Sequence, residues 1–316
     1  MSKHLKCSAV LIFLIIAALF AIGQVHLREG RPHRVTVALV MKSLANEFFL
    51  TMEQGARDHH MNNAERYDLL IYGIKDEQAV SQQIHIVEQL MAIDVDAIII
   101  APADSKALVP VCQRAMASGV AVVNIDNKFD ATVIAERGLH IPFVGPDNYQ
   151  GAKAAGDYLA DHLSSGNQVA IIEGIPSAYN SQQRCLGFRK AMDDAGIIIV
   201  DTRPALWEMD RSYTTVISIL NEHRNVRALL CANDNMALGA AAAVKAASKR
   251  NSMYIIGFDN ISAVNNELKK GDILATVDQH AALIAVNGIE MALSMLNGED
   301  VDLVCTTPVE LVTAYE

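Results

Sequence analysis

The sequence predicts an α/β protein made of two doubly wound lobes, each built on a parallel sheet. Short apolar runs rich in β-branched residues alternate with longer segments of helical period, which is the pattern of strands buried on both faces. The chain has 316 residues, and a single hydrophobic core rarely organises so many. Its composition, 51% hydrophobic and 20% charged, is that of a globular protein and not of a disordered one.

Ten apolar runs are expected to form strands, and the segments between them are expected to form helices. Alternation of this kind gives parallel sheets with right-handed crossovers, and domain size favours two sheets of about five strands each. The predicted strands are 35–40, 68–72, 97–101, 120–125, 143–145, 169–173, 197–202, 228–232, 254–258 and 274–277. The predicted helices are 49–62, 80–93, 106–118, 149–163, 182–195, 213–222, 236–247 and 282–297.

No stretch of the chain reads as a proline- or serine-rich linker, so short crossing segments must join the two lobes. We place these crossings near Pro146, Gln279 and Glu310. The resulting prediction is an N-terminal lobe of residues 34–146 with 280–310. The C-terminal lobe then comprises residues 147–279 with 311–316.

The first residues predict export from the cytoplasm. Two lysines precede an apolar run over residues 9–22, and the run ends in small residues that suit a signal peptidase. The run is shorter than the roughly 20 residues that a bilayer span needs. We therefore predict a signal peptide over residues 1–23 and a periplasmic protein, with an uncleaved signal anchor as the alternative.

Charge and cysteine content exclude several classes of protein. The net charge is −10 and no run of lysine or arginine occurs, which argues against a nucleic-acid partner. The cysteines that remain after cleavage, Cys112, Cys185, Cys231 and Cys305, show neither a CxxC nor a zinc-binding spacing. We expect no metal and no cofactor. An oxidising compartment would permit one disulfide, but the spacing assigns no pair.

Polar and aromatic residues follow the predicted strands, where ligands of open α/β sheets bind. A sugar offers apolar C–H faces to aromatic rings and hydroxyl groups to planar carboxylate, amide and guanidinium groups. Each residue also has a structural interpretation, because Asp and Asn after a strand often cap the next helix and paired Phe often belong to the core. The strand-end set is Lys42, Asn46, Phe48, Phe49, Asp126, Asn127, Asn233, Asp234, Phe258, Asp259, Asp278 and Gln279.

The motifs of common enzymes are absent from the sequence. It contains no GxSxG, no HExxH, no GxxxxGK[ST] and no GxGxxG after the first strand. We therefore predict a binding protein with no catalytic residues. Acid–base chemistry by Asp126 and Asp259 is the alternative that the pattern leaves open.

The order and spacing of several motifs resemble the ribose-binding type of periplasmic sugar-binding protein, whose fold is shared by the sugar domain of the lactose-repressor family. The resemblance runs from about Val35 to the C-terminus. It is carried by SLANEFF at 43–49, DAIIIAPAD at 96–104, Arg184 with Gly187 and Phe188, NDNMALG at 233–239, GFD at 257–259 and ATVDQ at 275–279.

This resemblance implies the type I periplasmic binding protein fold, with three crossings and a ligand in the cleft between the lobes. It implies a monosaccharide or sugar alcohol as ligand, the permease of an ABC transporter as partner, and in some members a chemoreceptor. We expect a monomer. Sensing through a chemoreceptor or sensor kinase is the alternative function, and the missing helix-turn-helix excludes a repressor.

The resemblance also assigns roles to single residues. Phe48, Phe49 and Phe258 would sandwich the sugar ring, while Asp126, Arg184, Asn233, Asp259 and Gln279 would bind hydroxyl groups. Asn46 matches a sugar-contacting type as well, and Trp207 stands where the ribose binder has another aromatic residue. Two positions depart from the pattern: Lys42 replaces a small hydroxyl residue, and Asn127 replaces an arginine. This apparent exchange of a cation between the two positions puts ribose itself in doubt.

Overall fold

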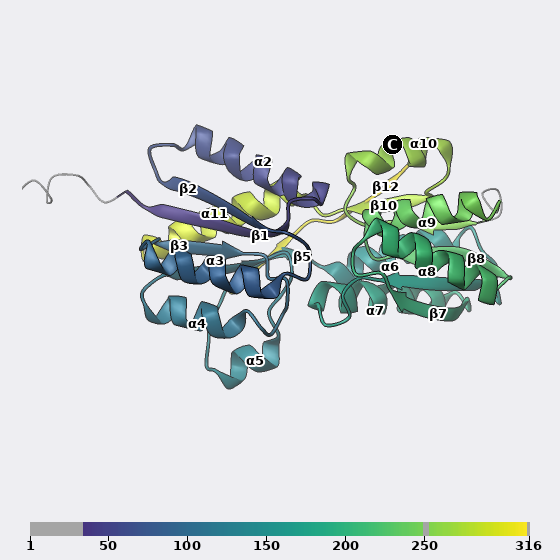
Figure 1. Cartoon of the computed structure of the whole chain (residues 1–316), viewed down its shortest axis with the longest axis horizontal. Helices are drawn as coiled ribbons and strands as arrows, with labels where there is room; N and C mark the ends of the chain where they lie inside the picture. Colours follow the sequence, from purple (N-terminus) through teal and green to yellow (C-terminus); the bar gives the residue numbers. More distant parts are fainter. Residues whose placement is uncertain (1–33, 249–252, 315–316) are drawn as a thin grey trace, which may run out of the picture. The chain divides into compact units, whose positions relative to one another are not determined.

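The protein is described by a computed structural model that covers residues 34–248 and 253–314. The predicted signal peptide lies outside these residues. Residues Thr36–Glu316 make up one compact unit, which contains two six-stranded sheets. Figure 1 shows the two sheets, each with helices packed on it.

The first sheet is entirely parallel. Its strands lie in the order β11-β5-β4-β3-β1-β2, and every pair of neighbours runs in the same direction. The four residues of β3 are all buried, as expected for a strand covered on both faces. The bounds are β1 (Thr36–Ser43), β2 (Asp68–Ile74), β3 (Ala97–Ile100), β4 (Ala121–Ile125), β5 (Phe143–Pro146) and β11 (Val304–Thr307).

The second sheet repeats this arrangement and adds one antiparallel edge. Its order is β12-β10-β9-β8-β6-β7, and only the β10–β12 pair is antiparallel among the described strands. Such an edge strand is common on otherwise parallel sheets. The bounds are β6 (Gln168–Glu173), β7 (Ile198–Pro204), β8 (Val226–Cys231), β9 (Tyr254–Ile256), β10 (Ala275–Asp278) and β12 (Glu310–Thr313).

Helices cover both faces of each sheet. In the first lobe α3 and α4 pack together on one side, and α2 and α11 pack together on the other. In the second lobe α6 pairs with α7, and α8 pairs with α9. The bounds are α2 (Glu47–Asn62), α3 (Val80–Ala92), α4 (Val109–Ala117), α5 (Ala131–Glu136), α6 (Asn148–Ala160), α7 (Tyr179–Asp194), α8 (Met209–Glu222), α9 (Asp234–Ala246), α10 (Asn265–Lys270) and α11 (Ala281–Leu296).

Each lobe has its own hydrophobic core. In the first, Ile98 and Ile100 of β3 pack against Val87 and Leu90 of α3. In the second, Phe188 of α7 is fully buried against α6 and the sheet. Burial of one such side chain stabilises the fold by about 1.5–3 kcal/mol. Separate cores hold each sheet rigid and so fix the positions of the strand ends.

The chain passes between the sheets three times, after β5, β10 and β11. The prediction of two doubly wound parallel-sheet lobes joined by three crossings is therefore confirmed. The third crossing consists of Pro308 and Val309, because β11 ends at Thr307 and β12 begins at Glu310. It lies just before the residue that the sequence suggested.

Among the strands and α-helices of the described residues, four short elements were not predicted: β11, β12, α5 and α10. The two strands have four residues each and are only partly buried, so they lack the continuous apolar run of the central strands. The two helices have six residues, which is less than two full turns and too short for a helical period to show.

Two further findings concern chemistry that the sequence left open. Cys112, Cys185, Cys231 and Cys305 are all free thiols, and the first three are buried. Burial raises the pKa of Cys112 and of Cys185 to about 12. Within residues 34–248 and 253–314, no helix is both long enough and apolar enough to cross a bilayer.

Candidate ligand-binding site

The strand ends of both lobes meet around one cavity of about 250 Å³. This volume is all the space between the atoms and includes open solvent. Ten of the predicted site residues line the cavity, together with two that were not predicted, Glu77 and Asn180. The lining is Lys42, Asn46, Phe48, Phe49, Glu77, Asp126, Asn180, Arg184, Trp207, Asn233, Asp259 and Gln279.

The first lobe contributes an ion pair. Lys42, near the end of β1, places its Nζ 3.0 Å from Oδ2 of Asp126, which follows β4, and both side chains are almost fully buried. That carboxylate oxygen accepts no well-aligned hydrogen bond despite the short distance, so the lysine supplies charge but poor hydrogen-bond geometry. Asp126 also has a left-handed backbone, with φ of 59°, a strain that is concentrated at functional sites.

Glu77 lies beyond β2 and was missed by the sequence analysis. Its Oε1 accepts a hydrogen bond of 3.4 Å from Asn46 Nδ2. Burial raises the pKa of the Glu77 carboxyl, while the charge of Lys42 and the bond from Asn46 lower it. A second buried carboxyl group therefore faces the cavity near Lys42, and it holds its proton more tightly than an exposed glutamate does.

The second lobe is organised around Arg184 of α7. Its guanidinium donates to Asn148 Oδ1 at 2.8 Å, to the Ala232 carbonyl at 2.7 Å and to Gln279 Oε1 at 2.9 Å. It also donates a longer bond of 3.5 Å to Asp259 Oδ1. The planar donors of this side chain are thus fixed by groups of four different segments, as an arginine fork permits.

Asp259 and Gln279 complete this network. Gln279 Nε2 donates to Asp259 Oδ1 at 2.5 Å, so one carboxylate oxygen is shared by Gln279 and Arg184. Burial raises the pKa of Asp259 well above its ordinary value, and Arg184 acts in the opposite direction. Asp259 has a φ of 125°, which makes it a further strained residue of the cavity wall.

Aromatic rings supply the apolar part of the lining. Phe48 and Phe49 meet edge to face with centroids 5.1 Å apart, a favourable geometry for aromatic pairs. Trp207 has a φ of 72° and reaches the cavity across Gly174. A Cβ on that glycine would lie 2.2 Å from the indole ring, so only glycine leaves room for the tryptophan.

Two asparagines of the lining serve as helix caps as well. Asn46 Oδ1 accepts from Phe48 N at the start of α2, and Asn233 Oδ1 accepts from Met236 N at the start of α9. These contacts satisfy N–H groups that the helix leaves free. The capping interpretation is therefore correct for both, and their amide nitrogens donate to two other residues of the lining, Glu77 Oε1 and the Trp207 carbonyl.

Two predicted site residues do not line the cavity. Phe258 lies beneath Arg184, with its ring centroid 3.8 Å from the guanidinium carbon. Asn127 is fully buried and donates to the Pro102 carbonyl at 2.9 Å. Its Oδ1 accepts from the backbone N of Asn180 in the other lobe, which places it beside the cavity and between the lobes.

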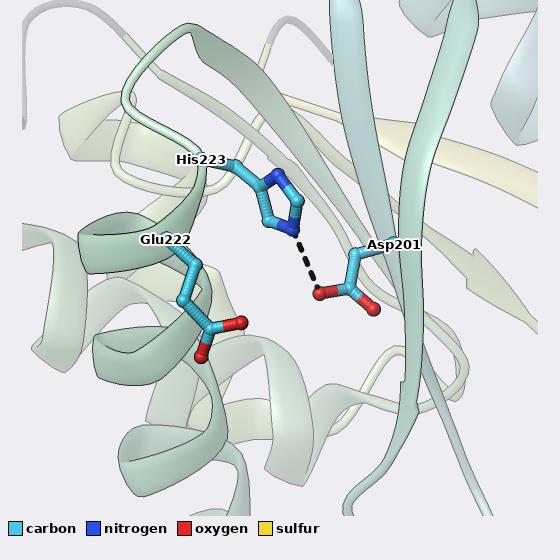
Figure 2. Close-up of side chains that lie close together, drawn as sticks. All are labelled: Asp201, Glu222 and His223. Atoms are coloured by element: carbon cyan, nitrogen blue, oxygen red, sulfur yellow. Dashed lines mark hydrogen bonds and ion pairs between the residues drawn. The ribbon is translucent and has the colours of Figure 1, made fainter.

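A third group of titratable residues lies away from the cavity. Asp201, Glu222 and His223 come close together (Figure 2), and His223 Nε2 lies 3.1 Å from Asp201 Oδ2. The guanidinium of Arg203 is paired with both carboxylates, and its bond to Glu222 lowers the pKa of that carboxyl. Because an arginine already balances the charge, we interpret the cluster as an ion-pair network.

Two larger hollows, of about 820 and 860 Å³, flank the cavity and include open solvent. One lies beside the crossing at His280 and Pro308, and the other lies between Lys75 and Asp210. The buried ionic groups of both lobes converge instead on the cavity of about 250 Å³. We therefore identify this cavity as the candidate ligand site.

The chain belongs to the periplasmic binding protein family, because residues 37–300 match the model of the periplasmic binding protein domain. Its fold, its cavity between two lobes and its similarity to solute-binding proteins make it a solute-binding protein and not an enzyme. Members of this family that serve ABC importers act in the periplasm, which is therefore the location of this chain.

The similarity extends to named relatives. The chain is 51% identical over 287 residues, 90% of each protein, to a D-ribose/D-allose-binding protein of Pseudomonas aeruginosa. A solute-binding protein from Burkholderia multivorans, with an unknown ligand represented as α-D-erythrofuranose, is 51% identical with a TM-score of 0.87, covering 89% of this chain and all of that one. One from Actinobacillus succinogenes with bound D-allose is 32% identical with a TM-score of 0.85, covering 89% and 98%.

Proposed function

We propose that this protein binds a neutral aldose of the allose or ribose kind, or a closely related polyol, and delivers it to the permease of an ABC importer. The observation that carries the proposal is the balance of buried charge around a small cavity. Lys42 and Arg184 oppose Asp126 and Asp259, and burial raises the pKa of the third carboxyl group, Glu77, which favours its uncharged form. Such a site has many hydrogen-bonding groups and little need for a charged ligand.

The twelve predicted site residues divide into three roles under this proposal. Phe48, Phe49 and Trp207 cover the apolar faces of the ring, as aromatic rings do for C–H surfaces. Phe258 and Asn127 support the site from outside. The remaining residues bind hydroxyl groups directly: Lys42, Asn46, Asp126, Arg184, Asn233, Asp259 and Gln279.

Two relatives support an aldose as the ligand. The Pseudomonas aeruginosa protein is a D-ribose/D-allose-binding protein, and the Actinobacillus succinogenes structure holds D-allose. We propose the same ligand class for this chain, together with export by the predicted signal peptide and a monomeric state. No contact in the described residues favours a chemoreceptor or sensor kinase as the main partner.

The proposal is tested by thermal unfolding of the protein from Gln24 onward against D-allose, D-ribose, other pentoses and hexoses, and inositols. A ligand at 1,000 times its dissociation constant adds about 4 kcal/mol to the free energy of unfolding. We expect a clear rise of the melting temperature with allose or ribose, confirmed by calorimetric titration. A folded, ligand-free protein that responds to none of these compounds would refute the proposal.

A further inference from the structure

Helix α7, which carries Arg184, begins without a capping side chain of its own. Its N-cap residue is Ala178, whose backbone has the extended geometry of a cap but whose methyl group accepts no hydrogen bond. By contrast, Asn46, Asp130, Asp147 and Asn233 cap their own helices with side-chain oxygens. The first N–H groups of a helix have no backbone partner within it. In α7, Asn180 Oδ1 accepts from Ser181 N at 2.9 Å, which leaves the N–H groups of Tyr179 and Asn180 to find acceptors outside the helix.

Those acceptors come from the other lobe. Ser105 Oγ accepts from the backbone N of Tyr179 at 3.1 Å, and Asn127 Oδ1 accepts from the backbone N of Asn180 at 3.1 Å. Ser105 lies between β3 and α4, and Asn127 follows β4, so both belong to the first lobe. Their partners are the first two residues of α7 in the second lobe.

Both acceptors are held in place within their own lobe. Asn127 Nδ2 donates to the Pro102 carbonyl at 2.9 Å and to Ser105 Oγ at 3.2 Å. The backbone carbonyl of Asn127 accepts from Asn124 Nδ2 at 2.9 Å. Both donors of the Asn127 amide are thus engaged within the first lobe, and its oxygen accepts from Asn180 N of α7. The two acceptors are therefore preorganised for the helix that approaches them.

We propose that Ser105 and Asn127 cap helix α7 across the cleft, so that contact between the lobes completes the helix that positions Arg184. Asn180 and Arg184 are four residues apart, which places them one turn apart on the same face. The cap thus stabilises the turn that leads directly to the guanidinium. This inference rests on the proposed binding function, because it assigns Ser105 and Asn127 as positioning residues for the ligand site.

The cap has a specific consequence for affinity. When a ligand binds only one conformation, its apparent dissociation constant is the intrinsic constant divided by the populated fraction of that conformation. Loss of a cap would lower the fraction of molecules in which the two lobes meet through Ser105, Asn127 and α7, without removing a contact to the ligand. The affinity for every sugar should then fall by the same factor, which distinguishes this role from that of a residue that touches a hydroxyl group.

The experiment compares Ser105→Ala and Asn127→Ala with the parent protein. Amide hydrogen exchange should become faster at Tyr179 in the first variant and at Asn180 in the second. Titration with D-allose and D-ribose, followed by the fluorescence of the single tryptophan Trp207, should show about fivefold weaker binding of both sugars, the factor that corresponds to a typical cap. The dissociation rate should rise accordingly.

Two further variants control for a general loss of stability. Asp130→Ala removes the cap of α5, whose donor Val133 lies in the same lobe, so it should lower the melting temperature and leave sugar affinity unchanged. Ala178→Ser gives α7 a cap of its own. In the Asn127→Ala background it should slow amide exchange at the start of α7 without restoring sugar affinity, because a cap within the second lobe stabilises the helix whether or not the two lobes meet.

The outcomes separate this inference from the proposed function. If the parent protein binds none of the sugars, the proposed function fails, and the exchange rates of Tyr179 and Asn180, which require no ligand, still test the cap. If the parent binds sugar but both variants keep its exchange rates and its affinity, the cap across the cleft is refuted. Unequal losses for allose and ribose would also overturn it, because they would indicate direct contact with a hydroxyl group.

Discussion

The two walls of the cavity differ in how far their polar groups are already engaged. On the wall of the second lobe, Arg184 holds Asn148, Gln279, Asp259 and a backbone carbonyl. On the wall of the first lobe, one oxygen of Asp126 lacks an aligned hydrogen bond although Lys42 lies close. The first wall therefore retains hydrogen-bonding capacity that the second has largely used.

This difference predicts that the two walls have different roles in ligand binding. A network fixed before the ligand arrives loses little conformational freedom on binding, and so contributes affinity. Groups with unused capacity respond to the pattern of hydroxyl groups that the ligand offers, because a buried polar group left unpaired is costly. We expect the second lobe to set how tightly a sugar binds and the first lobe to set which sugar binds.

Removal of Arg184, on the wall of the second lobe, should have the largest effect on sugar affinity. Arg184→Ala leaves Asp259 buried without its cation, and breaking such a pair costs about 3–5 kcal/mol. We expect calorimetry to show loss of binding for every sugar. Arg184→Lys, the matched control, keeps the charge but not the planar fork, and it should bind at an intermediate level. Undiminished binding by Arg184→Ala would show that the second wall does not set affinity.

Removal of the Asp126 carboxylate should have the next largest effect. Asp126→Ala leaves Lys42 buried without its partner, and we expect a loss of about 2–3 kcal/mol in binding free energy from the unpaired polar groups. Asp126→Asn retains the shape and should lose less. Calorimetric affinities equal to the parent's for both variants would remove Asp126 from the binding set.

Substitution of Lys42, on the wall of the first lobe, should change the selectivity between sugars. Lys42→Ser restores the small hydroxyl type that the ribose-binding resemblance implies at this position. We expect the ratio of the ribose and allose dissociation constants to shift roughly tenfold, the effect of about 1.4 kcal/mol, in favour of ribose. An equal loss for both sugars would contradict a selective role of the first wall.

Glu77 should affect how the free energy of unfolding depends on pH. Burial raises the pKa of its carboxyl in the folded protein. The group therefore stabilises the fold fully below the unfolded pKa of about 4.3, and this contribution is lost as the pH rises through the folded pKa. Glu77→Gln should be more stable than the parent at pH 8 and should lose this advantage toward pH 4, as measured by urea unfolding. The exposed Glu65→Gln serves as the control and should show no such trend.

The fold could be predicted from the sequence because its central strands are apolar on both faces. Runs such as Ala97–Ile100 are short and rich in β-branched residues, which favours a strand over a buried helix. Most of the candidate site could be predicted for the same reason, since Asp126, Asp259 and Gln279 directly follow such runs. Short edge strands escaped prediction because partial burial leaves a mixed pattern that also occurs in loops.

Other site residues could not be predicted because no strand end marks them. Glu77 lies three residues beyond β2 in a polar loop, where a glutamate is ordinarily solvated. Asn148 and Asn180 lie at the beginnings of helices, where the sequence indicates only capping. Asn127 was predicted to bind the ligand but lies beside the cavity, because its amide is held by Pro102 and Ser105, which are remote in the sequence.

The free cysteines have a consequence for how this protein matures. Cys112, Cys185 and Cys231 are buried in the folded chain, where burial raises the pKa of each thiol and suppresses the reactive thiolate. An exported chain meets oxidising enzymes before it folds, when these thiols are still exposed. Folding of the core therefore competes with the formation of non-native disulfides. Variants that fold more slowly should accumulate cross-linked species, which non-reducing gels would show.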